Sequence, residues 1–314
     1  MELRHLRCFI AVAEELHFAR AAERLHIEQS PLSRAIKELE EDLGVQLFVR
    51  TTRSTQLTRA GRMFLEHVPR VFASLQQARD SVKAAANGFH GQLRIALSDG
   101  ITPSCFSALL ALCRQEEPEI EIRLSEVPLS RQIKGLHDDL YDVGFAQSDE
   151  VGDELIADPV WHDPLVVAVP ARHPLLAYKH VPLDELLRYP LALADSNACE
   201  GHARQVECVL RRMNQEPLIA ERVASFDLMM TLASAGFALG LAGSSQIAAS
   251  RATGVVARPL AGGPYMLTTY LLRGGREPSD ALARFIERVY VVQPPNGKTS
   301  AARAKLDPLE EIVP

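Results

Sequence analysis

Residues 18–40, FARAAERLHIEQSPLSRAIKELE, decide the fold of the N-terminal part of this chain. Apolar side chains recur here at three- and four-residue spacing in two short runs, which predicts two helices. His26 and Ile27 leave room only for a tight turn between them. The first run is Phe18, Ala21, Ala22 and Leu25, and the second is Leu32, Ile36 and Leu39. The small alanine pair would let the two helices cross closely.

The polar side of the second helix has the chemistry of a recognition helix. Short hydrogen-bonding side chains lie near its start and cations follow them: Gln29, Ser30, Ser33, Arg34 and Lys37. Gln and Arg can make paired hydrogen bonds to purine edges in the major groove of DNA. For this stretch taken alone, the alternative is an ordinary amphipathic hairpin whose polar face is only solvated.

The residues around this stretch favour DNA binding. Residues 1–65 closely resemble the winged helix-turn-helix of LysR-type transcriptional regulators, through MELRHLRCFIAVAEELHFARAAERLHI, QSPLSRAIKELEEDLGVQLFVRT and LTRAGRMFL. The resemblance implies that the second helix enters the major groove, with base or phosphate contacts from Gln29, Ser30, Pro31, Ser33 and Arg34. At Glu28 the chain departs from the family, which often has a capping Ser there. A Glu satisfies the first backbone N–H groups less well, although its charge suits the positive end of the helix.

A cationic strip follows the second helix. No acidic residue occurs from position 44 to position 65, whereas four arginines do: Arg50, Arg53, Arg59 and Arg62. Such a strip can neutralise phosphates even in a chain whose net charge is −6. Residues 50–58 alternate polar and β-branched side chains, which predicts a small hairpin wing. The resemblance places the wing over the minor groove or the backbone, with Arg50 and Arg53 as contacts; the alternative is arginines that only solubilise a loop.

Length and composition indicate an intracellular protein of several domains. The 314 residues, 47% of them hydrophobic, allow two or more domains with sizeable cores. No apolar run approaches the length of a membrane span, and the N-terminus is not a signal peptide, so we expect a soluble cytoplasmic protein. The five cysteines are odd in number and contain no C-x-x-C pair, which predicts neither a disulfide framework nor a zinc site.

A long helix is predicted after the wing, with Thr58 as its N-cap. Its apolar positions alternate steps of four and three residues: Phe64, Val68, Val71, Leu75, Ala78, Val82, Ala85 and Phe89. This heptad spacing is typical of a two-helix coiled coil, so we expect a dimer that presents two recognition helices to two half-sites. Pro69 should kink or interrupt the helix near Leu65. Asn87 and Gly88 should end it.

From Gln92 onward strands alternate with helices, which predicts a parallel α/β sheet with right-handed crossovers. A looser resemblance to the same family, through YDVGFA, DPLVVAVPARHPLL and LASAGFALGLAGSS, implies two Rossmann-like lobes that resemble periplasmic binding proteins and enclose a ligand cleft. The predicted domains are a winged helix-turn-helix (1–58), a linker or dimerisation helix with a hinge (59–90), an effector-binding domain (91–292) and a flexible C-terminal tail (293–314). Lobe I comprises 91–163 and 267–292, and lobe II comprises 164–266.

The loops at the strand ends are candidate effector-binding positions. In open α/β lobes ligands bind outside the carboxyl ends of the strands, near helix N-termini. The residues expected to hold a small polar molecule there are Ser98, Gly100, Thr102, Leu129, Ser130, Gln147, Asn197 and Phe226. The alternative is that the hydroxyl residues among them only cap helices. If Asp99 and Asp195 point into the cleft, the effector should be cationic, hydroxylated or neutral.

Cys199 and Cys208 suggest an alternative, a redox-responsive regulator. Peroxide-sensing members of the family carry a redox pair at this location with this spacing, and a thiolate at a helix N-terminus oxidises readily. The flanking residues NACEGHARQVEC do not match those members well. A buried Cys is also commonly just a small hydrophobic residue, as we expect for Cys8, Cys105 and Cys113.

The sequence contains no catalytic signature. It lacks S-x-x-K, G-x-S-x-G, a phosphate-binding loop and a metal-ligand pattern, so we expect no enzyme activity, no cofactor and no metal. A purely architectural DNA-binding protein would leave the larger part of the chain without a role. We therefore predict a transcriptional regulator whose DNA affinity or DNA bending is controlled by a small-molecule effector. The resemblance implies a DNA operator and RNA polymerase as partners, and a dimer or a homotetramer built from two dimers.

Overall fold

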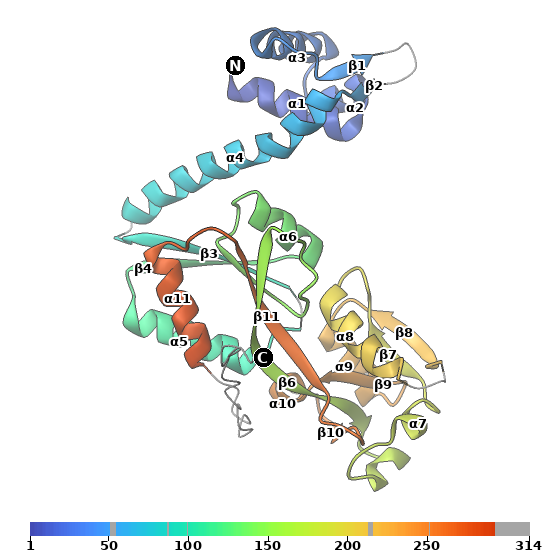
Figure 1. Cartoon of the computed structure of the whole chain (residues 1–314). Coiled ribbons are helices and arrows are strands. Elements are labelled where there is room, and N and C mark those ends of the chain that lie inside the picture. The colour runs from blue at the N-terminus through green and yellow to red at the C-terminus, as the bar shows by residue number, and fades with distance from the viewer. Residues whose placement is uncertain (51–54, 87, 99, 213–215, 251, 293–314) are drawn as a thin grey trace, which may run out of the picture. The chain divides into compact units, whose positions relative to one another are not determined.

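A computed structural model describes residues 1–50, 55–86, 88–98, 100–212, 216–250 and 252–292. The chain divides into two compact units. The first unit comprises Met1–Ser98, Glu117–Asp158 and Leu271–Leu282, and the second comprises Asp99–Glu116, Pro159–Tyr270 and Ala283–Pro314. The first unit holds the helix-turn-helix, the long helix and one α/β lobe, and the second unit holds the other lobe (Figure 1). The predicted C-terminal tail lies outside the described residues.

The N-terminal domain is a winged helix-turn-helix, as predicted. Its helices are α1 (Leu3–Glu15), α2 (Phe18–Arg24) and α3 (Gln29–Leu43), and its strands are β1 (Phe48–Arg50) and β2 (Thr55–Leu57). Phe9 and Val12 of α1 pack with Leu32, Ile36 and Leu39 of α3 in one buried core. The wing is confirmed as an antiparallel hairpin of β1 and β2, and its tip lies outside the described residues.

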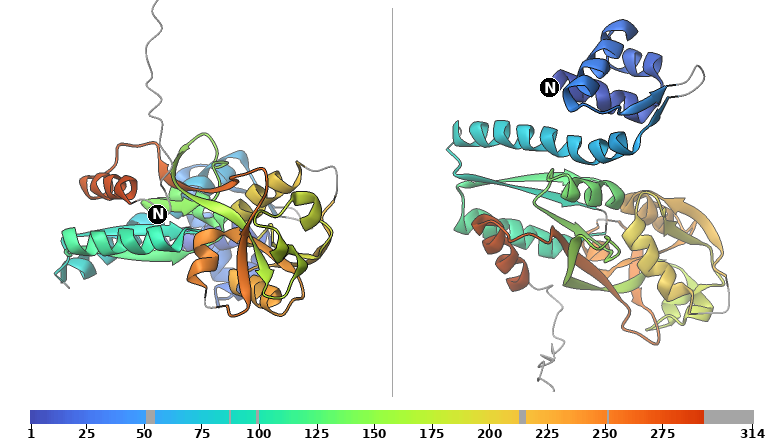
Figure 2. Two further views of the ribbon diagram at one scale, coloured as in Figure 1. Left: turned by 90° about the horizontal axis from the view of Figure 1, so that it is seen from below. Right: turned by 45° about the horizontal axis from the view of Figure 1, so that its top comes forward.

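The long helix α4 (Arg59–Ala86) follows the wing directly (Figure 2). The Thr58 hydroxyl accepts a hydrogen bond from the Gly61 N–H at 2.9 Å, so the predicted N-cap is confirmed. The predicted long helix is confirmed. The chain is helical on both sides of Pro69, so an interruption there is wrong, and a kink stays a prediction. Proline removes a single backbone donor from a helix of this length, and the remaining turns hold the helix together. Gly88 follows the helix with a positive φ of 85°, as expected of a C-terminal stop.

The α/β lobe of the first unit has a parallel core. Its strands are β3 (Gly91–Leu97), β4 (Ile120–Glu126) and β5 (Val143–Ala146), and its helix is α6 (Leu129–His137). The strand order is β4-β3-β5, with both neighbours parallel to β3. The carboxyl ends of β3 and β5 therefore lie at one edge, followed by Ser98 and Gln147.

Two long strands, β6 (Leu155–Pro170) and β11 (Met266–Gly274), run from one unit into the other. The second unit also holds the following strands and helices: α5 (Pro103–Glu116), η1 (Pro174–Ala177), α7 (Leu183–Leu186), β7 (Leu191–Ala194), α8 (Glu200–Leu210), β8 (Ile219–Val223), α9 (Phe226–Ser234), β9 (Leu239–Gly243), α10 (Ser244–Ala249), β10 (Val255–Pro259) and most of α11 (Asp280–Val291).

The sheet of the second unit is mixed, which corrects the prediction of a purely parallel sheet. The strand order is β6-β9-β7-β8, and β10 pairs with β6. Strand β7 is parallel to β8 and β9, whereas β6 is antiparallel to both β9 and β10. Strand β10 was not predicted. It returns along β6 after Gly254, whose φ is 83° and whose carbonyl accepts the Ala171 N–H.

Among the residues that the structure describes, no helix is both long enough and apolar enough to cross a lipid bilayer.

Gly61 allows α4 to lie close to Leu47, at the end of the segment that joins α3 to β1. A Cβ atom there would collide with the carbonyl oxygen of Leu47 and would lie 2.9 Å from Leu57 Cδ2. The backbone oxygen cannot move aside without disturbing the base of the wing, because the same oxygen accepts the Thr58 N–H at 2.9 Å.

We predict that Gly61→Ala destabilises the winged domain by about 1–3 kcal/mol through overpacking, although Ala is the better helix former. Urea unfolding followed by circular dichroism measures the change. The control is Gly274→Ala, because a Cβ atom at Gly274 meets nothing within 4 Å. Equal midpoints for the two variants would contradict the prediction.

Candidate nucleic-acid interface and effector-binding groups

Helix α3 turns one polar face outward because its other face is buried. Leu32, Ile36 and Leu39 lie in the core, and the opposite face carries the residues predicted to contact DNA. Gln29, Ser30, Pro31, Arg34 and Lys37 are exposed, and Ser33 is half-buried. Among the described residues, no side-chain hydrogen bond from Glu28 caps the helix, as the sequence suggested.

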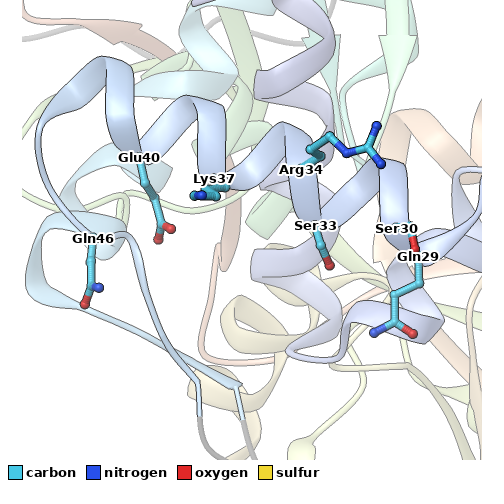
Figure 3. A pocket seen from close by; sticks show the side chains of 7 residues that line it. All are labelled: Gln29, Ser30, Ser33, Arg34, Lys37, Glu40 and Gln46. Carbon is cyan, nitrogen blue, oxygen red and sulfur yellow. The ribbon is translucent and has the colours of Figure 1, made fainter.

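The structure brings five of these predicted residues together along one surface hollow of about 670 Å³ (Figure 3). They are Gln29, Ser30, Ser33, Arg34 and Lys37. Pro31 is exposed but does not line the hollow. The backbone of Arg50 lies in β1, opposite Thr55. Arg53 lies outside the described residues. The contacts predicted for these two arginines therefore stay predictions.

The carboxylates near the C-terminal end of α3 contact other groups of the same domain. Four carboxylates follow Lys37 in the sequence, and each has a partner within the domain. Glu38 lies 3.2 Å from His5 Nε2, Glu41 lies 3.6 Å from Lys37 Nζ, Glu40 accepts two backbone N–H groups, and Asp42 pairs with the terminal amino group. The terminal amino group lowers the pKa of Asp42. These contacts orient the four carboxylates within the domain, whereas Arg34 and Lys37 on the same helix are exposed.

Sequence reasoning missed two residues of this hollow, Glu40 and Gln46. The Glu40 carboxylate accepts hydrogen bonds from the N–H groups of Leu47 at 2.8 Å and Phe48 at 3.0 Å. It therefore fixes the segment that joins α3 to the wing. The spacing of apolar residues could not reveal this role, because the hydrogen bonds join α3 to backbone N–H groups seven and eight residues further along the chain.

In the first unit, the predicted effector residues lie around the ends of β3 and β5. The carbonyl oxygen of Phe145 accepts hydrogen bonds from the N–H group of Ser98 at 3.0 Å and from its hydroxyl at 3.3 Å. Ser98 therefore joins two strands. Gln147 and Leu129 are buried, and Ser130 is exposed.

Gln132 is a buried residue of this region that sequence reasoning missed. Its side-chain amide donates to the carbonyl oxygens of Ala96 at 2.8 Å and Phe145 at 3.1 Å. Gly144 makes room for it, because a Cβ atom there would lie 2.5 Å from Gln132 Nε2. A Gln on the apolar face of α6 was the signal in the sequence that could have identified it.

In the second unit, Thr102 precedes α5 and is 1% exposed. Within the part of the chain that the structure describes, its hydroxyl has no hydrogen-bond partner. An unpaired buried hydroxyl is costly, and the N-terminus of a long helix favours an electron-rich partner. Thr102 is therefore well suited to contact a ligand.

Gly100 and Phe226 line a small cavity together with Cys199, His202 and other residues. Its volume of about 30 Å³ is suited to a water molecule rather than to a metabolite. His202 Nε2 lies 3.1 Å from the carbonyl oxygen of Leu241. Asn197 is exposed and does not line this cavity.

Asp195 shapes the turn that leads into α8. Its Oδ1 atom accepts the N–H groups of Asn197 and Ala198, both at 2.9 Å. These two backbone hydrogen bonds lower the pKa of Asp195. The local backbone thus orients the Asp195 carboxylate and keeps it charged. The expectation of a cationic, hydroxylated or neutral effector stays a prediction. Asp99 lies outside the described residues.

The geometry of α8 opposes the redox alternative. Cys199 is the buried N-cap residue of α8, and Cys208 is exposed nine positions later in the same helix. At 1.5 Å per residue the two Cα atoms are about 13 Å apart along the helix, whereas a disulfide requires less than about 7 Å. The pair could bond only if α8 unwound. Cys8, Cys105 and Cys113 are buried, as expected, and burial raises the pKa of Cys105 to about 11.

Among the described residues, no group of three or more His, Cys, Asp and Glu side chains is arranged to hold a metal ion.

Comparison with known proteins identifies both halves of the chain. Residues 3–62 match the family described as bacterial regulatory helix-turn-helix protein, lysR family. Residues 86–290 match the LysR substrate binding domain. Two relatives from curated sequences are the HTH-type transcriptional regulators YnfL of Escherichia coli (strain K12) and AlsR of Bacillus subtilis (strain 168). YnfL is 34% identical over 77% of this chain and 82% of its own, and AlsR is 32% identical over 78% and 81%.

The solved structure of full-length CbnR in complex with its target DNA is similar to this chain throughout. The TM-score is 0.67 at 29% identity, and the match covers 93% of this chain and 100% of CbnR. The matching families are those of regulators, which confirms that the chain is not an enzyme. The predicted order of a winged helix-turn-helix, a long helix and a two-lobed α/β domain is likewise confirmed. The chain belongs to the LysR family of DNA-binding transcriptional regulators.

Proposed function

We propose that this regulator binds duplex DNA as a twofold pair and that a small molecule, bound by its α/β domain, sets the affinity for the DNA or the bending of the DNA. The observation that carries the proposal is the outward face of α3. Its amide, hydroxyl and cationic groups lie along one open hollow on a rigid helix. The complex of CbnR with its target DNA supports the same role for this domain here.

Within that proposal, α3 lies in the major groove. Gln29 and Arg34 read base edges there, because both side chains can form paired hydrogen bonds with purines. Ser30, Pro31, Ser33 and Lys37 contact bases or neighbouring phosphates. The wing contributes Arg50 and Arg53 at the backbone or the minor groove.

Helix α4 joins two copies of the chain in this proposal. The first part of the predicted heptad seam is wrong, because Val68 is buried in the core of the winged domain and Phe64 packs against that core. The rest of the seam is open: Val71 is 45% exposed and Val82 is 71% exposed. Ala78 and Ala85 of the same seam are also exposed. A partner helix would cover this apolar row and place two copies of α3 on two half-sites. By family resemblance, two such dimers form a tetramer that contacts RNA polymerase when active. The protein acts in the cytoplasm.

The effector is a small polar molecule bound by groups that the lobes present at their strand ends. The groups are those of Ser98, Gly100, Thr102, Leu129, Ser130, Gln147, Asn197 and Phe226. The unpaired hydroxyl of Thr102 at the start of α5 is the strongest support for this assignment. Control of transcription then follows from linkage. A ligand that prefers one arrangement of the dimer shifts the spacing of the recognition helices and the bend of the DNA.

We predict that Arg34→Ala weakens specific DNA binding by about 1–3 kcal/mol and relaxes sequence preference at one operator position, because a base contact is lost. Fluorescence anisotropy of a duplex from the region beside the chain's own gene, compared with single-base variants of it, measures both effects. A loss that is equal on all duplexes would instead make Arg34 a phosphate contact.

We predict that Val82→Asp raises the dimer dissociation constant by about tenfold or more, because a carboxylate would be buried without a partner at the seam. Sedimentation equilibrium of the full chain gives the constant. Gln77→Asp adds the same charge at an exposed position on the outer side of the helix and should leave the dimer unchanged. The seam is wrong if the two variants behave alike.

A thermal-shift screen of metabolites on the full chain tests the effector site. We expect a compound that stabilises the protein by an amount that rises with the logarithm of its concentration above Kd and that changes the protein's affinity for the same duplex. Thr102→Val should weaken binding of that compound by about two- to tenfold, because one hydrogen bond is lost. Ser107→Ala removes an exposed hydroxyl from α5, the helix that follows Thr102, and should have no effect. Unchanged affinity in Thr102→Val would remove Thr102 from the site.

A further inference from the structure

The polar hollow beside α3 extends past the residues already assigned to DNA. It continues from Lys37 to Glu40 and then to Gln46, a residue of the segment that joins α3 to the wing. Figure 3 shows Gln46 at the opposite end of the hollow from Gln29, with Lys37 and Glu40 between them. Gln46 is exposed, although both residues that follow it are buried.

The backbone on both sides of Gln46 is held in place. Gly44 ends α3 with a φ of 69°, and the Val45 N–H bonds to the Glu40 carbonyl oxygen at 3.2 Å. On the other side, the Glu40 carboxylate holds the next two N–H groups. The Gln46 carbonyl oxygen itself accepts the Thr58 hydroxyl at 2.8 Å. Because the backbone is already fixed, only the side chain of Gln46 has to be ordered when it binds, which favours a contact role.

We propose that the side-chain amide of Gln46 donates a hydrogen bond to a DNA phosphate oxygen at the edge of the major groove. The inference rests on the proposed docking of α3 in that groove. From Gln29 to Lys37 the helix rises about 12 Å, which is about the width of the major groove. Gln46 lies beyond Lys37 and therefore meets the sugar–phosphate backbone rather than base edges.

The chemistry of the neighbours agrees with a phosphate. Glu40 is the carboxylate nearest to Gln46 along the hollow, and its Oε1 atom already accepts two backbone N–H groups. An amide can donate to a phosphate oxygen without adding a charge. Gln46 therefore fixes the position of α3 along the duplex and reads no sequence.

The test measures binding of the full-length dimeric protein to two DNA duplexes. One duplex has the sequence beside the protein's own gene, and the other has the same base composition in scrambled order. Gln46→Ala should weaken binding to both duplexes equally, by about two- to tenfold. Gln46→Lys should restore the affinity and steepen the slope of log K against log salt by about 0.9, as one more phosphate is neutralised. The control is Gln77→Ala, an exposed glutamine of α4, which should bind as the unmodified chain does. Thermal melts show that each variant is folded.

Three outcomes overturn the inference. The first is equal affinity of Gln46→Ala and Gln77→Ala, the second is a loss confined to the specific duplex, and the third is an unchanged salt slope in Gln46→Lys. Arg34→Ala separates this inference from the proposed function. If Arg34→Ala weakens binding and Gln46→Ala does not, only the phosphate contact is wrong. If neither duplex binds the unmodified chain, both proposals are wrong.

Discussion

The burial of Leu32, Ile36 and Leu39 against α1 is the constraint on which the rest of the DNA-binding domain depends. Three apolar side chains at helical spacing fix the rotation of α3 about its own axis. Once that rotation is fixed, every residue on the opposite face must point to solvent. The outward direction of Gln29, Arg34 and Lys37 is therefore a consequence of packing. The packing of the core therefore determines which side chains of α3 are available for binding.

Charge is the second constraint, since the chain as a whole is acidic and its DNA-binding face must still accept a polyanion. The carboxylates after Lys37 are partnered by an imidazole, an ammonium group, the chain terminus and two backbone N–H groups. Each partner lies within the same domain, and the pairs of Glu41 and Asp42 are exposed and therefore weak. The exposed cations Arg34 and Lys37 are the groups of α3 that can attract a phosphate backbone.

Much of the fold could be predicted because it follows from local patterns. The 3.6-residue period of α2 and α3, the Thr58 cap and the glycine stop after α4 follow from residues that are near one another in the sequence. The antiparallel neighbours of β6 and the presence of β10 were not predictable in this way, because strand pairing depends on residues far apart in the chain. The long helix after the wing was predicted, and only an interruption at Pro69 was wrong, because the rest of a long helix outweighs the one donor that the proline removes.

The candidate sites show the same difference between features that follow from local sequence patterns and features that depend on distant contacts. The polar face of α3 was predictable from spacing, and the structure gathers most of it in one hollow. Glu40 and Gln132 were missed, because each acts through hydrogen bonds to backbone groups that a residue pattern does not display. For the effector residues, the position at strand ends could be predicted from the sequence, whereas their hydrogen bonding could not. Thr102 is distinguished by an unpaired buried hydroxyl, a property that only coordinates can reveal.

The interleaving of the two compact units along the chain has a consequence for how this protein can change over evolution. Each unit is assembled from separate stretches of sequence, and β6 and β11 belong to both. Cutting out either compact unit exactly would require changes at several places in the gene, because each unit is made of three separate stretches. An exchange of one whole unit for another therefore cannot be made by a single crossover.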